Sequence, residues 1–219
     1  MKIAIVIPAY NEEKNIAELL NYFKNYPREG IIVVDDGSRD KTSVIVERFG
    51  AILLKHKENL GKGMAHRTAF EYAIKNGFEG VITIDADGQH MPQEIENFIK
   101  EKDSADILVG TRRMTLANMP LIRYFTNKVT SLTVSLIASQ RVFDSQSGFR
   151  YISSEVLRKV PLRTGRFQTE SEILIKAGRM GFKIGCVPIS TVYREEKSYI
   201  NPFIDTCRFI GLACRSLFE

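Results

Sequence analysis

The sequence predicts an α/β fold, in which helices cover both faces of one mostly parallel β-sheet. Short runs of aliphatic, β-branched residues alternate along the chain with longer segments whose apolar residues recur every three to four positions. The short runs are apolar at nearly every position, which is typical of strands buried on both faces. Helical segments of this length can connect parallel strands. We therefore expect a doubly wound sheet with a helical appendage at the C-terminus.

Each expected strand is a short run that leads into a loop or a helix. The strands are expected at residues 3–7, 31–34, 51–54, 81–84, 105–109 and 183–188. Residues 144–150 are expected to form a polar loop. Helices are expected at residues 12–25 with Asn11 as N-cap, from Asp40 to Phe49, at 119–138, at 153–159 with Ser153 as N-cap, and at 199–218. Three more are expected with one approximate end: one that follows the loop at 59–63 and ends near Lys75, one that begins at Pro92, and one that ends near Met180.

Polar side chains follow three of the expected strands at their carboxyl ends. They stand at residues 10–12 after the first strand, at Asp35 and Asp36 after the second, and at Asp85 and Asp87 after the fourth. Parallel strands place all their carboxyl ends at one edge of a sheet, where ligands bind in open α/β folds. We therefore expect these three groups to converge.

The segment after the fourth strand is the one around which the chain is organised. Asp85, Asp87, Gln89 and His90 stand within six residues, and Asp-x-Asp places two carboxylates on one side of an extended backbone. Carboxylate and amide oxygens are suitable ligands for a divalent cation that also binds phosphate. Two alternatives remain: a turn in which Asp85 caps the next helix, or a phosphatase nucleophile of the haloacid dehalogenase type. The position deep in the chain and Gln89 favour the metal.

The charge of the chain is concentrated in its middle. The 219 residues carry a net charge of +5, made of −4 over residues 1–106, +8 over 107–167 and +1 over 168–219. A basic segment can face a phosphorylated substrate, an anionic membrane or a nucleic acid, and we rank nucleic acid last because no nucleic-acid-binding motif accompanies it. No signal peptide and no apolar run of about 20 residues is evident, so we expect no membrane span. Three cysteines without metal spacing predict reduced thiols.

Six motifs in order along the chain resemble those of the family 2 glycosyltransferases of the GT-A fold, and more closely those of the dolichol- or polyprenyl-phosphate sugar synthases. The motifs lie at residues 8–12, 33–38, 59–63, 85–89, 110–113 and 146–150. The resemblance implies one catalytic domain at residues 1–198, with a nucleotide-sugar half at about 1–110 and an acceptor half at about 111–198. Residues 199–219 would form a C-terminal amphipathic helix.

The resemblance also implies roles for individual residues. The donor would be a nucleotide-diphosphate sugar of the GDP-mannose or UDP-glucose type, and the acceptor a lipid phosphate. Transfer would proceed with inversion. Asp85, Asp87 and Gln89 would surround Mg²⁺ or Mn²⁺, with Asp87, Arg112 and Arg123 as catalytic residues. Substrate-binding residues would be Pro8, Tyr10, Glu12, Asp35, Asp36, Lys62, Asp85, Gln146, Arg150, Arg194 and Lys197, among which Arg194 and Lys197 would join Arg112 and Arg123 around the acceptor phosphate.

Some interpretations stay open at the level of sequence. A hydroxyl acceptor would need a general base such as Glu170 or Asp144. A sugar-1-phosphate nucleotidyltransferase shares a nucleotide-binding sheet, and a nucleotide-sugar sensor would lack turnover. Lys62 is not part of a P-loop, because the upstream glycine and the following Ser or Thr are missing, so we expect it to contact the nucleotide or nothing. His66 and His90 are expected to be local hydrogen-bonding residues. The enzyme would reach the cytoplasmic face of the membrane by peripheral contact or through a membrane partner.

Overall fold

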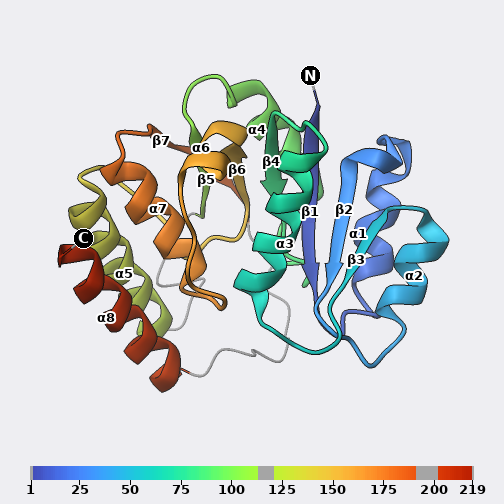
Figure 1. The fold of residues 1–219 in the computed structure, drawn as a ribbon, viewed down its shortest axis with the longest axis horizontal. Coiled ribbons are helices and arrows are strands. Elements are labelled where there is room, and N and C mark those ends of the chain that lie inside the picture. Colours follow the sequence, from blue (N-terminus) through green and yellow to red (C-terminus); the bar gives the residue numbers. More distant parts are fainter. Residues whose placement is uncertain (1, 113–120, 191–201, 219) are drawn as a thin grey trace.

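The computed structural model describes residues 2–112, 121–190 and 202–218 of the chain. It shows one seven-stranded sheet with helices on both faces (Figure 1). The strand order is β3-β2-β1-β4-β6-β5-β7, and β6 runs antiparallel to both of its neighbours, whereas the other described pairs are parallel. The strands are β1 (Ile3–Ala9), β2 (Ile31–Asp35), β3 (Ile52–Lys55), β4 (Gly80–Thr83), β5 (Ile107–Arg112), β6 (Arg150–Ser153) and β7 (Ile184–Ile189).

The helices divide between the two faces of the sheet. Eight α-helices are described: α1 (Ile16–Tyr22), α2 (Thr42–Phe49), α3 (Lys62–Lys75), α4 (Ile95–Glu101), α5 (Leu121–Ala138), α6 (Ser154–Lys159), α7 (Thr169–Arg179) and α8 (Pro202–Phe218). Three short 3₁₀ helices lie at η1 (Phe23–Asn25), η2 (Arg28–Gly30) and η3 (Pro92–Glu94).

Two hydrophobic cores fill the space between the helices and the sheet. Alternate residues of β1 point to opposite faces, so Val6 joins the core beneath α3, α5, α6, α7 and α8, while Ile7 joins the core beneath α1, α2 and α4. Leu212 of α8 is buried in the first of these cores, and α8 packs against α5 and α7. Among the described residues, no helix is both long enough and apolar enough to cross a bilayer.

Two local expectations are wrong. Asn11 does not cap α1: its φ is +56°, and the helix begins at Ile16 with Asn15 at the N-cap position. The polar loop expected over 144–150 ends one residue early, because Arg150 begins β6. This four-residue strand lies between β4 and β5 and pairs with both, although its sequence has no obvious strand signature.

Candidate active site

The loops after β1 and β2 are bonded to one another at the carboxyl edge of the sheet. The backbone N–H of Asn11 donates to Ser38 Oγ over 2.9 Å, and the backbone N–H of Arg39 donates to the side-chain oxygen of Asn11, Oδ1, over 2.9 Å. The left-handed conformation of Asn11 turns its side chain toward that amide, a conformation that asparagine tolerates better than most residues. The Glu12 amide donates to Thr42 Oγ1 at the start of α2. The expected convergence of the first two strand ends is therefore confirmed.

Asp35 and Asp36 hold these loops in place. The side chain of Asp35 is fully buried and accepts hydrogen bonds from the Ser38 amide, at 2.8 Å, and from Ser43 Oγ. Asp36 accepts from the amides of Leu60, at 3.0 Å, and Gly61, at 2.8 Å. Both carboxylates are thus engaged by the chain itself, which defines the position of the loop that leads into α3.

His56 continues this network, and sequence reasoning did not identify it. Its Nδ1 lies 2.6 Å from Asp36 Oδ1 and its Nε2 lies 2.9 Å from Thr68 Oγ1 of α3. The signal for it was its place directly after β3, because the third parallel strand ends at the same edge as the acidic strand ends.

A cleft of about 470 Å³ opens beside these loops, a volume within the range of small-ligand sites. Its lining comes from the ends of three strands and includes Tyr10 after β1, Ser38 after β2, and His56 and Asn59 after β3. Of the residues predicted to contact the nucleotide, Tyr10 belongs to this lining, whereas Pro8, Glu12 and Asp36 do not.

Lys62, at the start of α3, joins two carboxylates from distant parts of the chain. Its Nζ lies 2.7 Å from Asp85 Oδ1 and 2.7 Å from Glu170 Oε1 of α7. Burial alone would lower the pKa of Lys62 and raise that of Asp85. The charges reverse both effects, so the pKa of Lys62 is raised and that of Asp85 is held at about 2. The expectation that Lys62 contacts the nucleotide or nothing thus missed this ion pair.

Of the three residues predicted to bind a metal, Asp85 belongs to this ion pair, and Asp87 and Gln89 follow it closely in the sequence. Asp87 Oδ1 accepts from the Gln89 amide over 3.0 Å, and both residues are partly exposed. Within the described part of the chain, no three carboxylate, imidazole or thiolate groups converge on one point. Asp85, Asp87 and Gln89 therefore suit a cation of the Mg²⁺ type. Such a cation is commonly held by one or two carboxylates, and water and substrate phosphates complete its coordination.

The loop before β6 closes over Asp85. A Cβ on Gly148 would collide with the Asp85 carboxylate, so the backbone of this loop approaches the carboxylate more closely than any side chain permits. Thr83 of β4 donates its hydroxyl to the Gly148 carbonyl over 2.6 Å. The loop and the strand that carries Asp85 therefore form one rigid unit.

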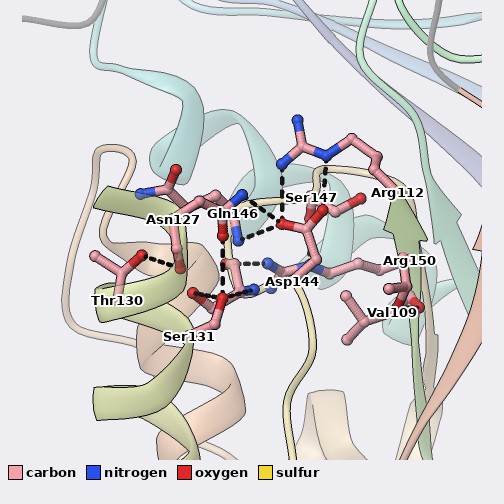
Figure 2. Close-up of polar contacts among 11 residues, drawn as sticks. Val109, Arg112, Asn127, Thr130, Ser131, Asp144, Gln146, Ser147 and Arg150 are labelled. Atoms are coloured by element: carbon pink, nitrogen blue, oxygen red, sulfur yellow. Dashed lines mark hydrogen bonds and ion pairs between the residues drawn. The ribbon is translucent and has the colours of Figure 1, made fainter. Parts of the chain in front are cut away.

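Arg112, at the end of β5, is oriented by a buried carboxylate (Figure 2). Its Nε and Nη2 donate to the two oxygens of Asp144 over 2.6 and 2.9 Å, and Asn127 Nδ2 of α5 donates to the same carboxylate over 3.0 Å. Asp144 has no exposed surface. Burial would raise its pKa, but the hydrogen bonds and the charge of Arg112 hold the pKa below its usual value. The backbone N–H of Gln146 also donates to Asp144 Oδ1, over 3.3 Å.

Arg150 is buried inside the same loop. Its guanidinium donates to the carbonyls of Ser147, at 2.6 Å, Glu170, at 2.5 Å, and Ser145, at 2.7 Å. The residue is 2% exposed. These contacts tie the loop before β6 to the start of α7, so in this structure Arg150 holds the loop.

Two buried histidines border the site. Among the described residues, no hydrogen-bond partner is found for His66 Nε2 or His90 Nδ1, which differs from the expectation that both residues bond locally. Burial lowers the pKa of His66 to about 3 and also lowers that of His90, so both rings are neutral at pH 7. The remaining predicted acceptor residues, which are the side chain of Arg123 and residues Arg194 and Lys197, lie outside the described part of the chain.

Comparison with known proteins decides the family. The family model described as glycosyl transferase family 2 matches residues 4–163. The chain belongs to this family. The expected α/β fold is also confirmed: the glucosyl-3-phosphoglycerate synthase of Mycobacterium tuberculosis, solved with UDP, superposes with a TM-score of 0.79 at 20% identity, covering 98% of this chain and 79% of that one. A second structure of that enzyme contains Mn²⁺, UDP and glucosyl-3-phosphoglycerate, with a TM-score of 0.71 at 21% identity, covering 99% of this chain and 78% of that one.

Two curated proteins are similar to this chain over most of its length. The UDP-N-acetylglucosamine–dolichyl-phosphate N-acetylglucosaminyltransferase of Methanococcus voltae is 37% identical over 217 residues, covering 88% of this chain and 86% of the relative. The polyprenol monophosphomannose synthase of Mycolicibacterium smegmatis is 26% identical over 205 residues, covering 87% of this chain and 77% of the relative.

Proposed function

We propose that this family 2 glycosyltransferase moves a sugar from a nucleotide-diphosphate sugar to a polyprenyl or dolichyl phosphate, with inversion at the sugar carbon. The observation that carries the proposal is the pairing of the acceptor-side carboxylates. Asp144 is bound by Arg112, and Glu170 is bound by Lys62. A hydroxyl acceptor needs a carboxylate that takes up a proton, whereas a phosphate is already ionised near neutral pH and needs cations that position it.

The donor would occupy the edge formed by the first four strands. The cleft beside Tyr10 and His56 would take the base and ribose, and Asp35 and Asp36 would act there by fixing the loops that line it. Asp85 and Asp87 lie at the end of β4, where the diphosphate would follow. Pro8 and Glu12 stay in the proposed donor site as neighbours of Tyr10.

Asp85, Asp87 and Gln89 would hold Mg²⁺ or Mn²⁺ together with the donor diphosphate. The bound ion would stabilise the negative charge that develops on the departing diphosphate. A structural neighbour with bound Mn²⁺ and UDP supports this part of the proposal. The Lys62 ammonium, held between Asp85 and Glu170, would add a fixed positive charge on the same side.

The acceptor phosphate would lie against Arg112. A guanidinium carries five N–H donors in a rigid plane, and the bond to Asp144 uses two of them while fixing the direction of that plane. A phosphate oxygen would then attack the sugar carbon as the bond from that carbon to the diphosphate breaks. Gln146 would border this side of the site, and Arg123, Arg194 and Lys197 stay proposed acceptor ligands. The names of two curated relatives support a lipid phosphate as acceptor. The reaction would then take place at the cytoplasmic face of a membrane.

The donor assignment is tested by a thermal-shift series with UDP- and GDP-sugars, each with Mn²⁺ and with chelator. A ligand that binds the folded state raises the melting temperature by mass action, so we expect one nucleotide to stabilise the protein only when the metal is present. Transfer is then measured with that donor and a polyprenyl phosphate. Release of pyrophosphate from a nucleoside triphosphate and a sugar 1-phosphate, without transfer to the lipid phosphate, would indicate a nucleotidyltransferase, and nucleotide binding without any product would indicate a sensor.

The site assignment is tested by Asp87→Ala. Asp87 is partly exposed at the edge of the sheet, so we expect the melting temperature to stay within about 3 °C of wild type while transfer falls at least about 1,000-fold. Asp103→Ala is the matched control: it removes an exposed carboxylate that follows α4, and this variant should transfer at the wild-type rate. An active Asp87→Ala enzyme would remove Asp87 from the site.

A further inference from the structure

Helix α5 presents a continuous apolar stripe to solvent. Phe125 is 60% exposed, Val129 61%, Leu132 62% and Leu136 71%. Their spacing of four, three and four residues places them on one face of the helix over three turns. Within the described part of the chain, no other helix exposes four large apolar side chains in this way.

The opposite face of α5 is buried against the site. Ser131 Oγ accepts from the Ser145 amide over 2.9 Å, and Asn127 donates to Asp144, as Figure 2 shows. Val134 lies in the hydrophobic core, and Ala138, one turn further along, is also fully buried. The helix therefore joins an exposed apolar surface to the loop that orients Arg112.

The size of the stripe fits a shallow contact better than a protein interface. At roughly 100 Å² for each of its four side chains, it exposes about 400 Å², half of the ~800 Å² per partner that a standard interface buries. An amphipathic helix that lies in a membrane interface needs no larger area, because it only immerses its apolar face in the boundary between headgroups and acyl chains.

The segment of sequence that carries the stripe is basic. Residues 107–143 contain no Asp or Glu, and carry five Arg or Lys residues. On α5 itself, Lys128 is exposed, with its Nζ 4.7 Å from the centre of the Tyr124 ring. Just after the helix, the guanidinium of Arg141 lies 4.5 Å from the centre of the Phe143 ring, which is 43% exposed. Basic side chains beside exposed apolar and aromatic groups complement an anionic lipid surface.

We propose that the stripe of Phe125, Val129, Leu132 and Leu136 docks the enzyme on an anionic lipid bilayer. The docked orientation turns the buried face of α5, with Asn127 and Ser131, toward the protein and away from the lipid. Through Asn127 and Asp144, the same helix is connected to Arg112 on its protein side. A role of docking in catalysis rests on the proposed function, in which the acceptor is a lipid phosphate. Binding of the protein to lipid vesicles is measured without any turnover.

The test is sedimentation of the full chain with vesicles of phosphatidylcholine, with and without about one-third phosphatidylglycerol. We expect wild type to bind the anionic vesicles, and to bind them less tightly at high salt, because screening weakens the attraction of the basic residues. The double variant Val129→Ser/Leu132→Ser should bind at least about tenfold more weakly, since both side chains lose apolar area that the membrane would bury. The control Val44→Ser removes a valine that is 44% exposed on α2 and should bind as wild type does.

A thermal-shift measurement with the nucleotide donor verifies that each variant is folded. Wild-type protein that stays in solution with anionic vesicles would overturn the proposal, as would equal binding by Val129→Ser/Leu132→Ser. Dimerisation of wild type that this double variant abolishes, without vesicle binding, would assign the stripe to a second copy of the chain instead. Vesicle binding with no transfer to any lipid phosphate would support the docking surface and contradict the proposed function.

Discussion

The bond between Arg112 and Asp144 gives the sharpest prediction for stability. Asp144→Asn keeps the shape of the side chain but removes its charge, which leaves the Arg112 guanidinium, whose side chain is 16% exposed, without its buried carboxylate. Removing one partner of a buried ion pair typically costs 3–5 kcal/mol, and the partial exposure of Arg112 places the expected loss at about 3 kcal/mol. For a chain of this size, that loss lowers the melting temperature by about 6–12 °C.

The measurement is urea unfolding of a double-mutant cycle. Arg112→Gln and Asp144→Asn alone should each destabilise the protein, and the double variant should be more stable than the sum of the two losses predicts, by about 2 kcal/mol. Asp103→Asn is the control, because Asp103 pairs with Lys102 at the surface, where its side chain is 79% exposed, and surface pairs contribute little. Additive losses, or a loss below about 0.5 kcal/mol in Asp144→Asn, would refute the reasoning.

The same pair predicts a dependence on pH. Because the folded-state pKa of Asp144 lies below that of an unfolded aspartate, its contribution to stability is fully present above the unfolded value of about 3.9. The contribution is lost as the pH falls through the folded pKa. The difference in unfolding free energy between wild type and Asp144→Asn should therefore be constant from pH 8 to about 5 and shrink at lower pH. In turnover, Asp144→Asn should raise the KM for the lipid phosphate and leave that for the donor unchanged.

Two further predictions concern the centre around Asp85. Lys62→Met removes the ammonium that lies between Asp85 and Glu170, so we expect a loss of about 2–3 kcal/mol at pH 7 in urea unfolding. Against the effect of burial, the Lys62 charge lowers the pKa of Asp85, so the loss should shrink near pH 5 as Asp85 begins to take up a proton in the variant, and an equal loss at both pH values would contradict this. Gly148→Ala should displace the Asp85 carboxylate and weaken donor binding about tenfold in a thermal-shift titration. Gly211→Ala, where a Cβ would meet only the end of the Arg215 side chain at 3.9 Å, should bind donor as wild type does.

The central strands that the sequence predicted share one physical property. A strand buried on both faces must be apolar at every position, and Val33 and Val81 lie in such runs, so no tertiary information was needed to find them. The same holds for the strand ends, since parallel strands bring their carboxyl ends together whatever their partners are. Strand β6, Arg150–Ser153, was not predicted, because it has only four residues, with a charged residue at one end and a serine at the other.

Contacts between distant polar residues could not be predicted in the same way. Lys62 was judged against a phosphate-binding loop and found unsuitable, yet its ion pairs with Asp85 and Glu170 join residues 23 and 108 positions apart in sequence. Asn127 stood within a helix whose apolar residues dominated its interpretation, although its side chain lies in the buried network with Asp144. Pattern reasoning assigns a residue to a face of its own element, but not to the partner that the face will meet.

The antiparallel direction of β6 explains how the loop at residues 144–149 reaches the carboxyl edge of the sheet. Thr83 of β4 and Val109 of β5 both pair with Arg150, the first residue of β6. In a parallel strand, the loop before the strand would lie at the opposite edge of the sheet, far from the substrates. Because β6 is reversed, the loop that precedes it lies at the carboxyl ends of β4 and β5. There Gly148 meets Asp85, and Asp144 meets Arg112. One reversed strand thus brings the proposed donor carboxylates and the proposed acceptor arginine to the same loop, so a change at Gly148 should affect the donor, whereas a change at Asp144 should affect the acceptor.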